Sequence, residues 1–408
     1  MKNVMLFIVL FIILSQKSSI LSQTKFSLDD LVNRSTPITL STSTNYREFD
    51  FLKEKIDTSL PIFLGESSHT IGDYNQLRVR MIQYLHEQLN YNVIAFEAPF
   101  ANLKYVSENR NTLTAEKMLK LGLFYCWKTN DLLELMKYIQ SHPKLKIMGF
   151  DCQDRNIDSL VVNDYKQKIE RKNAALGNEY LLLIEQFSLL MKINPFENHE
   201  VFKSESQVVI NQIDSFIPKL TNSEIIDFDI HFHITNLKNN CINFSLLKPN
   251  FSKSNVFRDS IMAENYLMLT KNLYPSEKVI VWGHNAHLSK QSLVTEYPIS
   301  MGEFLHRKLN YNSIGLFAYS GTYGYGWTYK ELKKIKKPSK KFIEFYLHKN
   351  NLEISYIDLQ NLPRYSWIKN NYKILDTKHG VMKTTPNKCF DGIIFFKHVG
   401  ESKYLNNL

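Results

Sequence analysis

Short apolar runs that alternate with helical stretches constrain the fold of this chain most strongly. Residues 60–64, 93–96 and 279–282 have the length and composition of buried β-strands. Between the first two runs, leucine and methionine recur at every fourth position of residues 76–89, which predicts an amphipathic helix. Strands that alternate with helices predict an α/β fold with a mostly parallel central sheet.

The remaining elements fit the same plan, apart from one long stretch. We predict further strands at 146–151, 313–318, 354–358 and 392–397, and helices at 45–57, 114–142, 258–273 and 302–309. Residues 156–250 lack the strand-then-helix rhythm and are predicted to be a helical insertion packed over the sheet. We expect residues 24–408 to form a single domain that includes this insertion.

The N-terminus has the pattern of a secretory signal peptide. Lys2 precedes an apolar run at residues 4–14, and residues 15–22 are mostly small and polar. We therefore expect residues 1–22 to be removed and the mature protein to be secreted or periplasmic. The apolar run is short for a bilayer span, although a retained anchor is the alternative. No stable membrane span is expected after processing.

The charge balance does not by itself indicate a nucleic-acid-binding protein. The formal net charge is +10, and the densest basic run lies at residues 333–341. Runs of this kind are mostly solvated loops or helix faces, and the sequence contains no recognisable nucleic-acid module.

The cysteines do not form a zinc-binding pattern. The four of them are scattered and contain no Cys-x-x-Cys pair: Cys126, Cys152, Cys241 and Cys389. An exported chain could form up to two disulfides from them, but their pairing cannot be read from the sequence.

Polar residues directly follow three of the predicted strands. Glu66 and His69 follow the first, Glu97 ends the second, and His284 and His287 follow the third. The carboxyl ends of parallel strands build the binding crevice of an open α/β sheet. Two glutamates and three histidines are therefore expected to converge at one edge, as an acid/base centre or a metal site.

The spacing of these residues is suited to activating a water molecule. A histidine at position 69 that hydrogen-bonds to a carboxylate such as Glu66 is held in one tautomer and becomes more basic. Arg78 lies at the start of the next helix, where a guanidinium can polarise a carbonyl group or stabilise an oxyanion. Each residue alone has a common structural explanation, and their convergence favours a functional one.

Taken in order, these motifs resemble the erythromycin esterase family. The likeness covers about residues 45–400 and includes the segments 65–69, 258–265, 281–287 and 390–396, together with Arg78, Glu97 and Met301-Gly302. Two positions depart from the family pattern. Thr70 stands where the family usually has glycine, and Gly283 stands where it has alanine.

The resemblance implies a three-layer α/β fold with a helical insertion, and hydrolysis of a small-molecule ester or lactone by water. It implies no cofactor and no metal. As a hypothesis, the resemblance makes His69 the general base, with Glu66 and Glu97 orienting His69 and the water. Arg78 and His284 would stabilise the oxyanion, and His287 would assist departure of the alcohol. A macrolide substrate would connect the protein to antibiotic resistance.

Three alternatives remain open at this stage. Ser67 and Ser68 lie beside His69, but a serine hydrolase would need a Gly-x-Ser-x-Gly elbow, which the sequence lacks. A metal-dependent hydrolase could use the same glutamates and histidines as ligands. The alternating cluster at residues 227–233 could also bind a metal, although a solvated strand or helix edge is favoured. The last alternative is an exported binding protein without catalysis.

Overall fold

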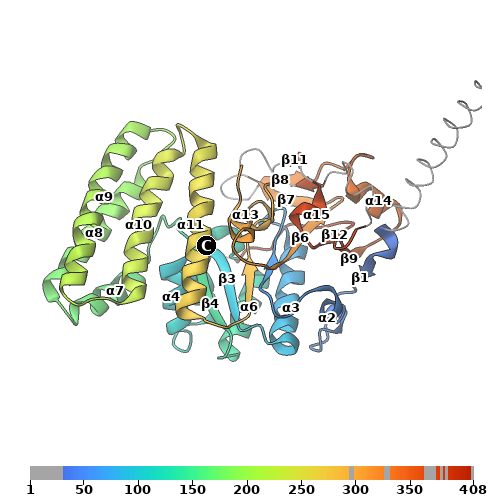
Figure 1. Ribbon diagram of the computed structural model, residues 1–408, viewed down its shortest axis with the longest axis horizontal. Coiled ribbons are helices and arrows are strands. Elements are labelled where there is room, and N and C mark those ends of the chain that lie inside the picture. Colours follow the sequence, from blue (N-terminus) through green and yellow to red (C-terminus); the bar gives the residue numbers. More distant parts are fainter. Residues whose placement is uncertain are drawn as a thin grey trace, which may run out of the picture.

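The computed structural model describes residues 31–293, 298–325, 331–362, 374–376, 380–381 and 385–405. The predicted signal peptide, residues 1–22, lies outside the described residues. A mixed α/β part occupies the centre and right of Figure 1, and long helices extend from it to the left.

The central sheet has eight strands in the order β1-β9-β12-β6-β2-β5-β3-β4. Their bounds are β1 Ser35–Pro37, β2 Ile62–Leu64, β3 Val93–Pro99, β4 Lys146–Asp151, β5 Val279–Trp282, β6 Asn312–Ala318, β9 Ile354–Asp358 and β12 Gly392–Phe396. The strands from β12 to β4 all run parallel, whereas β9 is antiparallel to both of its neighbours. The predicted α/β fold with a mostly parallel sheet is confirmed.

The runs that begin β2, β3 and β5 are apolar because both faces of the sheet are covered there. In β2, Ile62 and Leu64 pack into the core on one face, and Phe63 packs into the core on the other. Successive side chains of a strand point to opposite faces, so each residue of a doubly covered strand must be apolar. The same alternation between the two cores holds in β3 and β5.

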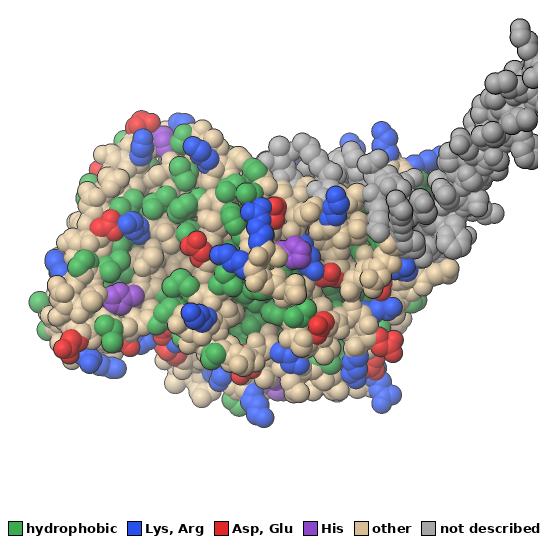
Figure 2. Space-filling view, viewed as in Figure 1, with side chains coloured by type: hydrophobic (Ala, Val, Ile, Leu, Met, Phe, Trp, Pro, Cys, Tyr) green, Lys and Arg blue, Asp and Glu red, His purple; other side chains and the backbone are tan. Residues whose placement is uncertain are grey.

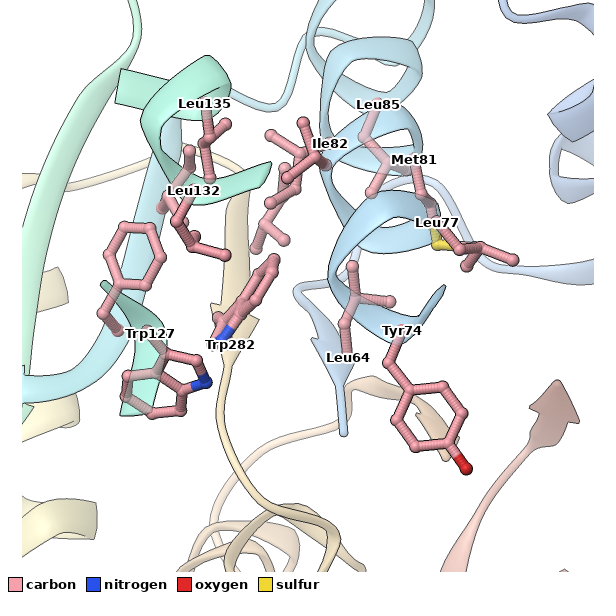
Figure 3. Packing of buried hydrophobic residues seen from close by; sticks show 14 of the residues in the cluster. Leu64, Tyr74, Leu77, Met81, Ile82, Leu85, Trp127, Leu132, Leu135 and Trp282 are labelled. Atoms are coloured by element: carbon pink, nitrogen blue, oxygen red, sulfur yellow. The ribbon is translucent and has the colours of Figure 1, made fainter. Parts of the chain in front are cut away.

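Helices cover each face of the sheet. The first face carries α2 Leu52–Lys55, α3 Gly72–Leu89, α5 Ala115–Gly122 and α6 Asn130–Ser141, after the short 3-10 helix η1 Arg47–Phe49. The second face carries α11 Phe251–Leu273, α13 Met301–His306, α14 Ile343–Lys349 and α15 Pro386–Cys389, and α4 Phe100–Glu108 contributes to both faces. Figure 3 shows side chains of α3 and α6 meeting over Trp282 of β5.

The helical stretch predicted at 114–142 is interrupted in the structure, because the chain leaves the helix after Gly122. Leu123 is extended (φ −113°, ψ 155°), and the 3-10 turn η2 Tyr125–Trp127 follows it. The next helix, α6, starts afresh, with the Thr129 hydroxyl accepting the backbone N–H of Leu132 as its N-cap. This break places Trp127 beside the carboxyl edge of the sheet.

Four helices form the part of the molecule on the left of Figure 1: α7 Ser159–Glu170, α8 Ala174–Lys192, α9 His199–Asn222 and α10 Phe228–Leu246. They share a separate hydrophobic core, which is why this stretch lacks the strand-helix rhythm of the rest. The helical insertion predicted at about 156–250 is therefore present. The assignment of the whole chain to one domain remains a prediction.

The expectation of a solvated edge at residues 227–233 is wrong for His233. This stretch enters α10, where helical periodicity turns His233 inward. Its Nε2 lies 3.1 Å from the hydroxyl of Tyr180, and its ring stacks on Tyr165 at a centroid distance of 4.4 Å. Burial lowers the pKa of His233 to about 3, so the ring is neutral.

The surface and the cysteines agree with the sequence analysis where they are described. Lys and Arg side chains are interspersed with Asp and Glu on the face in Figure 2. Most of the basic run at 333–341, which includes the end of strand β8 (Glu331–Lys334), is exposed.

All four cysteines are buried free thiols. None of the helices within the described ranges is long and apolar enough to cross a bilayer.

Candidate active site

Three strand ends bring the predicted residues together at the carboxyl edge of the sheet. Leu64 pairs with Trp282, and Trp282 pairs with Phe96, so β5 lies between β2 and β3. β5 therefore separates β3, which carries Glu97, from β2, which Glu66 follows, although the two strands are consecutive in the sequence. The register shifts between Phe96 and Pro99, and a shift of this kind re-aims the side chain of Glu97 within it.

The loops after β2 and β5 approach each other closely enough to require a glycine. The backbone N–H of Asn285 donates to the carbonyl oxygen of Glu66 at 2.8 Å. A Cβ atom on Gly65 would lie 2.1 Å from Oδ1 of Asn285, so no other residue fits without a shift of these loops. The close approach holds His284 near Glu66.

Glu66 is the centre of the first polar cluster and is completely buried. Its Oε1 accepts the indole N–H of Trp127 at 2.9 Å and lies 2.8 Å from Nδ1 of His69. Its Oε2 accepts a hydrogen bond from Nη2 of Arg78. An ionised carboxylate only accepts, so His69 carries its proton on Nδ1, and Nε2 keeps the lone pair of a base.

Arg78 supports this cluster from behind rather than facing a substrate. It is completely buried, stacks 3.5 Å over the ring of Trp282, and donates to Oδ1 of Asn75 at 3.1 Å. Burial lowers the pKa of Arg78 to about 10, against the opposing effect of Glu66. Because it does not line the cavity described below, the direct oxyanion role that we predicted for Arg78 does not fit its position. Its charge instead fixes Glu66.

A second cluster surrounds Glu97. Its Oε1 accepts from Nη2 of Arg258 at 2.9 Å, and its Oε2 accepts the backbone N–H of His284 at 2.9 Å. Arg258 comes from α11 and also donates from Nε to Oδ1 of Asp151 at 3.1 Å. Burial acts to raise the pKa of Glu97, but His287 and Arg258 outweigh it and lower the pKa to about 2. Glu97 is therefore a carboxylate across the neutral range.

His284 is held in the tautomer opposite to that of His69. It forms the N-cap of the short helix α12 (Asn285–Leu288), where its Nδ1 accepts the backbone N–H of Ala286 at 3.1 Å. A ring nitrogen that accepts carries no proton, so the neutral ring of His284 has its proton on Nε2. The rings of His69 and His284 meet edge to face at a centroid distance of 5.1 Å.

His287 is fixed by a carboxylate on one side and a guanidinium on the other. Its Nδ1 lies 2.8 Å from Oδ1 of Asp259, which also accepts the backbone N–H of Met301 at 2.7 Å. Its Nε2 lies 3.2 Å from Nη1 of Arg258. Burial lowers the pKa of His287, but Asp259 and Glu97 act more strongly and raise it above its ordinary value of 6.5.

A cavity of about 590 Å³ opens onto both clusters. His69, Glu97, Arg258, His284 and His287 line one side of it. The cavity is also lined by residues 120–126 and 128, by residues 153–156 and 158 after β4, and by Phe244 of α10. A volume of this size accommodates a small-molecule substrate, and the helical part of the chain supplies one of its walls.

The two serines next to His69 do not form a nucleophile. Ser67 is buried and its hydroxyl lies 3.1 Å from that of Tyr74, and Ser68 is buried with its hydroxyl 3.0 Å from that of Thr70. Neither serine lines the cavity. The serine-hydrolase alternative has no support in this geometry.

The geometry also bears on the metal alternative. Within the described ranges, no group of three or more histidine, cysteine, aspartate or glutamate side chains is placed to hold a metal ion. Arg258 already neutralises Glu97 and Asp151, and a cation at that position would meet its guanidinium.

Four residues of the two clusters were given no role in the sequence analysis: Trp127, Asp151, Arg258 and Asp259. Signals for three of them were present. Arg258 and Asp259 open one of the motifs of the family resemblance, and Asp151 ends the predicted strand at 146–151. Nothing local marked Trp127, because its contact with Glu66 spans two separate segments.

A histidine base on a strand-end loop, beside a histidine donor and a substrate-sized cavity, is an arrangement expected of a hydrolase. The chain belongs to the erythromycin esterase family, whose model matches residues 86–399. That match begins after Glu66, His69 and Arg78 in the chain.

Known relatives extend over nearly the whole chain. A putative hydrolase of Bacillus subtilis (strain 168), YbfO, is 25% identical, with 90% of this chain and 89% of the relative covered. An erythromycin esterase type II of Escherichia coli is 23% identical, with 86% of this chain and 92% of the relative covered. Together with the family match, they support the assignment of the protein as a hydrolase.

Two solved structures share the fold. A Bacillus cereus protein superposes with a TM-score of 0.79 at 18% identity, and covers 94% of this chain and 99% of its own. A mutant erythromycin esterase in its open conformation gives a TM-score of 0.66 at 16% identity, with 89% and 96% covered. At these identities the likeness shows the three-layer fold alone.

Proposed function

We propose that this protein hydrolyses ester or lactone bonds of small molecules with a water molecule that His69 activates. The observation that carries the proposal is the pair of opposite tautomers at the cavity. His69 offers a lone pair on Nε2, and His284 offers a proton on Nε2, with their rings 5.1 Å apart. A base and a donor side by side suit attack of water on a carbonyl group.

The proposed first step forms the tetrahedral intermediate. His69 removes a proton from the water as its oxygen attacks the carbonyl carbon, and the carbonyl oxygen becomes an oxyanion. The Nε2–H of His284 donates to this oxygen, and the fixed charge of Arg258 adds a favourable field. Glu66 stabilises the imidazolium that forms on His69, since the two groups lie 2.8 Å apart.

The second step breaks the bond to the alcohol. The intermediate collapses, the carbonyl re-forms, and the departing oxygen takes a proton, so that ester and water yield acid and alcohol. His69 returns the proton that it accepted. His287 also lines the cavity, and we assign it to assist this departure.

A test compares the mature protein with His69→Ala and His284→Leu on a panel of esters and lactones, macrolides included, each with and without chelator. We expect turnover that survives chelation and falls by about 10²–10⁴-fold in His69→Ala. His306→Ala, at an exposed histidine of α13, is the matched control and should keep its activity. Turnover that is lost with chelator and restored by a divalent metal would instead support the metal-dependent hydrolase.

Two further readouts separate the remaining alternatives. Hydrolysis in ¹⁸O-labelled water should give labelled acid without an acyl-enzyme burst, because no nucleophilic side chain takes part. Tight binding of esters without any turnover would instead favour the non-catalytic binding protein.

The name of the E. coli relative, erythromycin esterase type II, places macrolide lactones in the panel. Resistance to such an antibiotic is the consequence we propose if a macrolide proves to be the substrate.

We also propose that the protein is exported, on the basis of the basic start and the apolar run at residues 4–14. Expression in the source cell followed by N-terminal sequencing of extracellular and periplasmic fractions tests this. Cleavage near residue 22 is expected, and a chain that keeps residue 1 in the cytosol would contradict export.

A further inference from the structure

Two lysines line the same cavity as the catalytic groups. Lys120 lies in α5, and Lys128 follows directly after the 3-10 turn η2. Lys128 is half-buried, and the part of the chain that the structure describes gives it no carboxylate partner. Burial lowers the pKa of Lys128; Cys126 acts in the opposite direction, and the like charge of Lys120 lowers it further.

The carboxylates around the cavity are engaged elsewhere. Glu97 is held by Arg258, and Asp158 caps α7 by accepting the backbone N–H of Leu160 at 2.9 Å. Lys120 reaches Glu116 at 2.8 Å, on the outer side of α5 where that glutamate is half exposed. Lys128 is thus a cation in a partly desolvated position beside another cation, a situation that an anionic ligand relieves.

Asp154 is the remaining carboxyl group on the cavity wall, and below neutral pH it does not cancel this charge. It is buried, and its carboxyl accepts the backbone N–H of Asn156 at 3.2 Å. Burial raises the pKa of Asp154 to about 7, so it is largely neutral on the acid side of neutrality.

The wall between the two lysines is apolar. Leu121 and Leu123 are buried, and Phe124 and the more distant Phe244 also line the cavity. The cavity therefore combines apolar side chains, a pair of lysines and the base His69. A purely apolar substrate would leave the lysines partly desolvated without compensation.

We propose that the substrate carries an anionic group separate from the scissile ester, and that Lys128, assisted by Lys120, binds this group. The substrate class is an amphipathic ester with a carboxylate, or another anion of similar charge, joined to an apolar body. This inference rests on the proposed esterase function for the placement of the scissile bond, but not for the binding of the anion.

The kinetic test compares two esters that differ only at the end of the acyl chain: p-nitrophenyl pentanoate, which ends in methyl, and mono-p-nitrophenyl glutarate, which ends in carboxylate. The readout is the ratio of kcat/KM for the charged ester to that for the neutral one. Lys128→Met should lower this ratio about tenfold, the scale of one charge-assisted hydrogen bond. Lys128→Arg should restore part of it.

The matched control is Lys137→Met, at a lysine that is 55% exposed and pairs with Glu134 on α6. It should leave the ratio unchanged, because this side chain does not line the cavity. Added salt should reduce the preference for the charged ester in the wild-type protein more than in Lys128→Met. An equal ratio in wild type and Lys128→Met would overturn the proposal.

A binding measurement keeps this inference separate from the esterase proposal. Calorimetry with glutaranilic acid and pentananilide, the corresponding non-hydrolysable anilides, reports the anion site without turnover. Tighter binding of the acid that disappears in Lys128→Met, with no ester hydrolysed, would support the anion site and count against the esterase. Equal binding of both anilides by wild type and variant would refute the anion site even if esters are turned over.

Discussion

Replacing Glu66 with glutamine separates the structural role of this carboxylate from its catalytic role. The change keeps the size of the side chain and an oxygen that can accept from Trp127, but it removes the charge that faces Arg78. Both Glu66 and Arg78 are completely buried. Breaking a buried ion pair by removing one partner leaves an uncompensated charge, which costs about 3–5 kcal/mol of unfolding free energy.

A double variant tests whether this cost comes from the orphaned cation. In Glu66→Gln/Arg78→Met both charges are absent, and the methionine can keep contact with the ring of Trp282. We expect most of the lost stability to return, because a buried ion pair replaced by neutral groups is often close to neutral in free energy. Activity should remain low, since a glutamine does not stabilise the imidazolium of His69.

The assays are urea unfolding followed by far-UV circular dichroism, and kcat/KM on the best ester. Glu134→Gln is the control: its pair with Lys137 is exposed, so stability should change by less than about 1 kcal/mol. The reasoning is refuted if Glu66→Gln unfolds at the wild-type urea concentration, or if the double variant is less stable than the single one.

Three further predictions follow from the two clusters. The pKa of Glu97 lies at about 2 instead of its ordinary 4.5, so the stabilisation from its ionised form is complete above pH 4.5 and is lost as the pH falls toward 2. In Glu97→Gln the free energy of unfolding, measured against pH, should therefore fall less steeply over this range. In Gly283→Ala a Cβ atom would lie 2.9 Å from Oε2 of Glu97, and a small shift of that side chain relieves this contact; because alanine is the residue of the family pattern at this position, kcat/KM should be retained, and a large loss would contradict this. Trp127→Phe removes one donor to Glu66 and should cost about 1.5–3 kcal/mol in urea unfolding, whereas retention of full stability would show that the hydrogen bond is dispensable.

The predictions from the sequence agree best with the structure at the ends of the strands. Residues 146–151 were predicted as a strand and form β4 with the same bounds. Glu66, His284 and Glu97 were expected at one edge, and the register of Leu64, Trp282 and Phe96 places them there. Local apolar runs reveal where strands end, because the polar residue that follows a buried strand is the first one that can reach solvent or a ligand.

The site assignments that the sequence analysis made incorrectly all depend on long-range packing. Nothing in the pattern indicated that β5 lies between β2 and β3, or that Arg78 turns inward to stack on Trp282. Because helix was predicted across 114–142, the sequence analysis missed the turn that brings Trp127 to Glu66. A propensity summed along the chain contains no term for a hydrogen bond between residues 61 positions apart.

The sequence by itself determined which segments are buried strands and which polar residues follow them, and hence which side chains gather at one edge of the sheet. Only the tertiary structure decided the chemistry of each side chain there. Glu66 and the N–H of Ala286 hold His69 and His284 in opposite tautomers, and Arg258 reaches Glu97 from 161 residues away. A histidine becomes a base or a donor according to the partner of its other nitrogen, and that partner is set by folding.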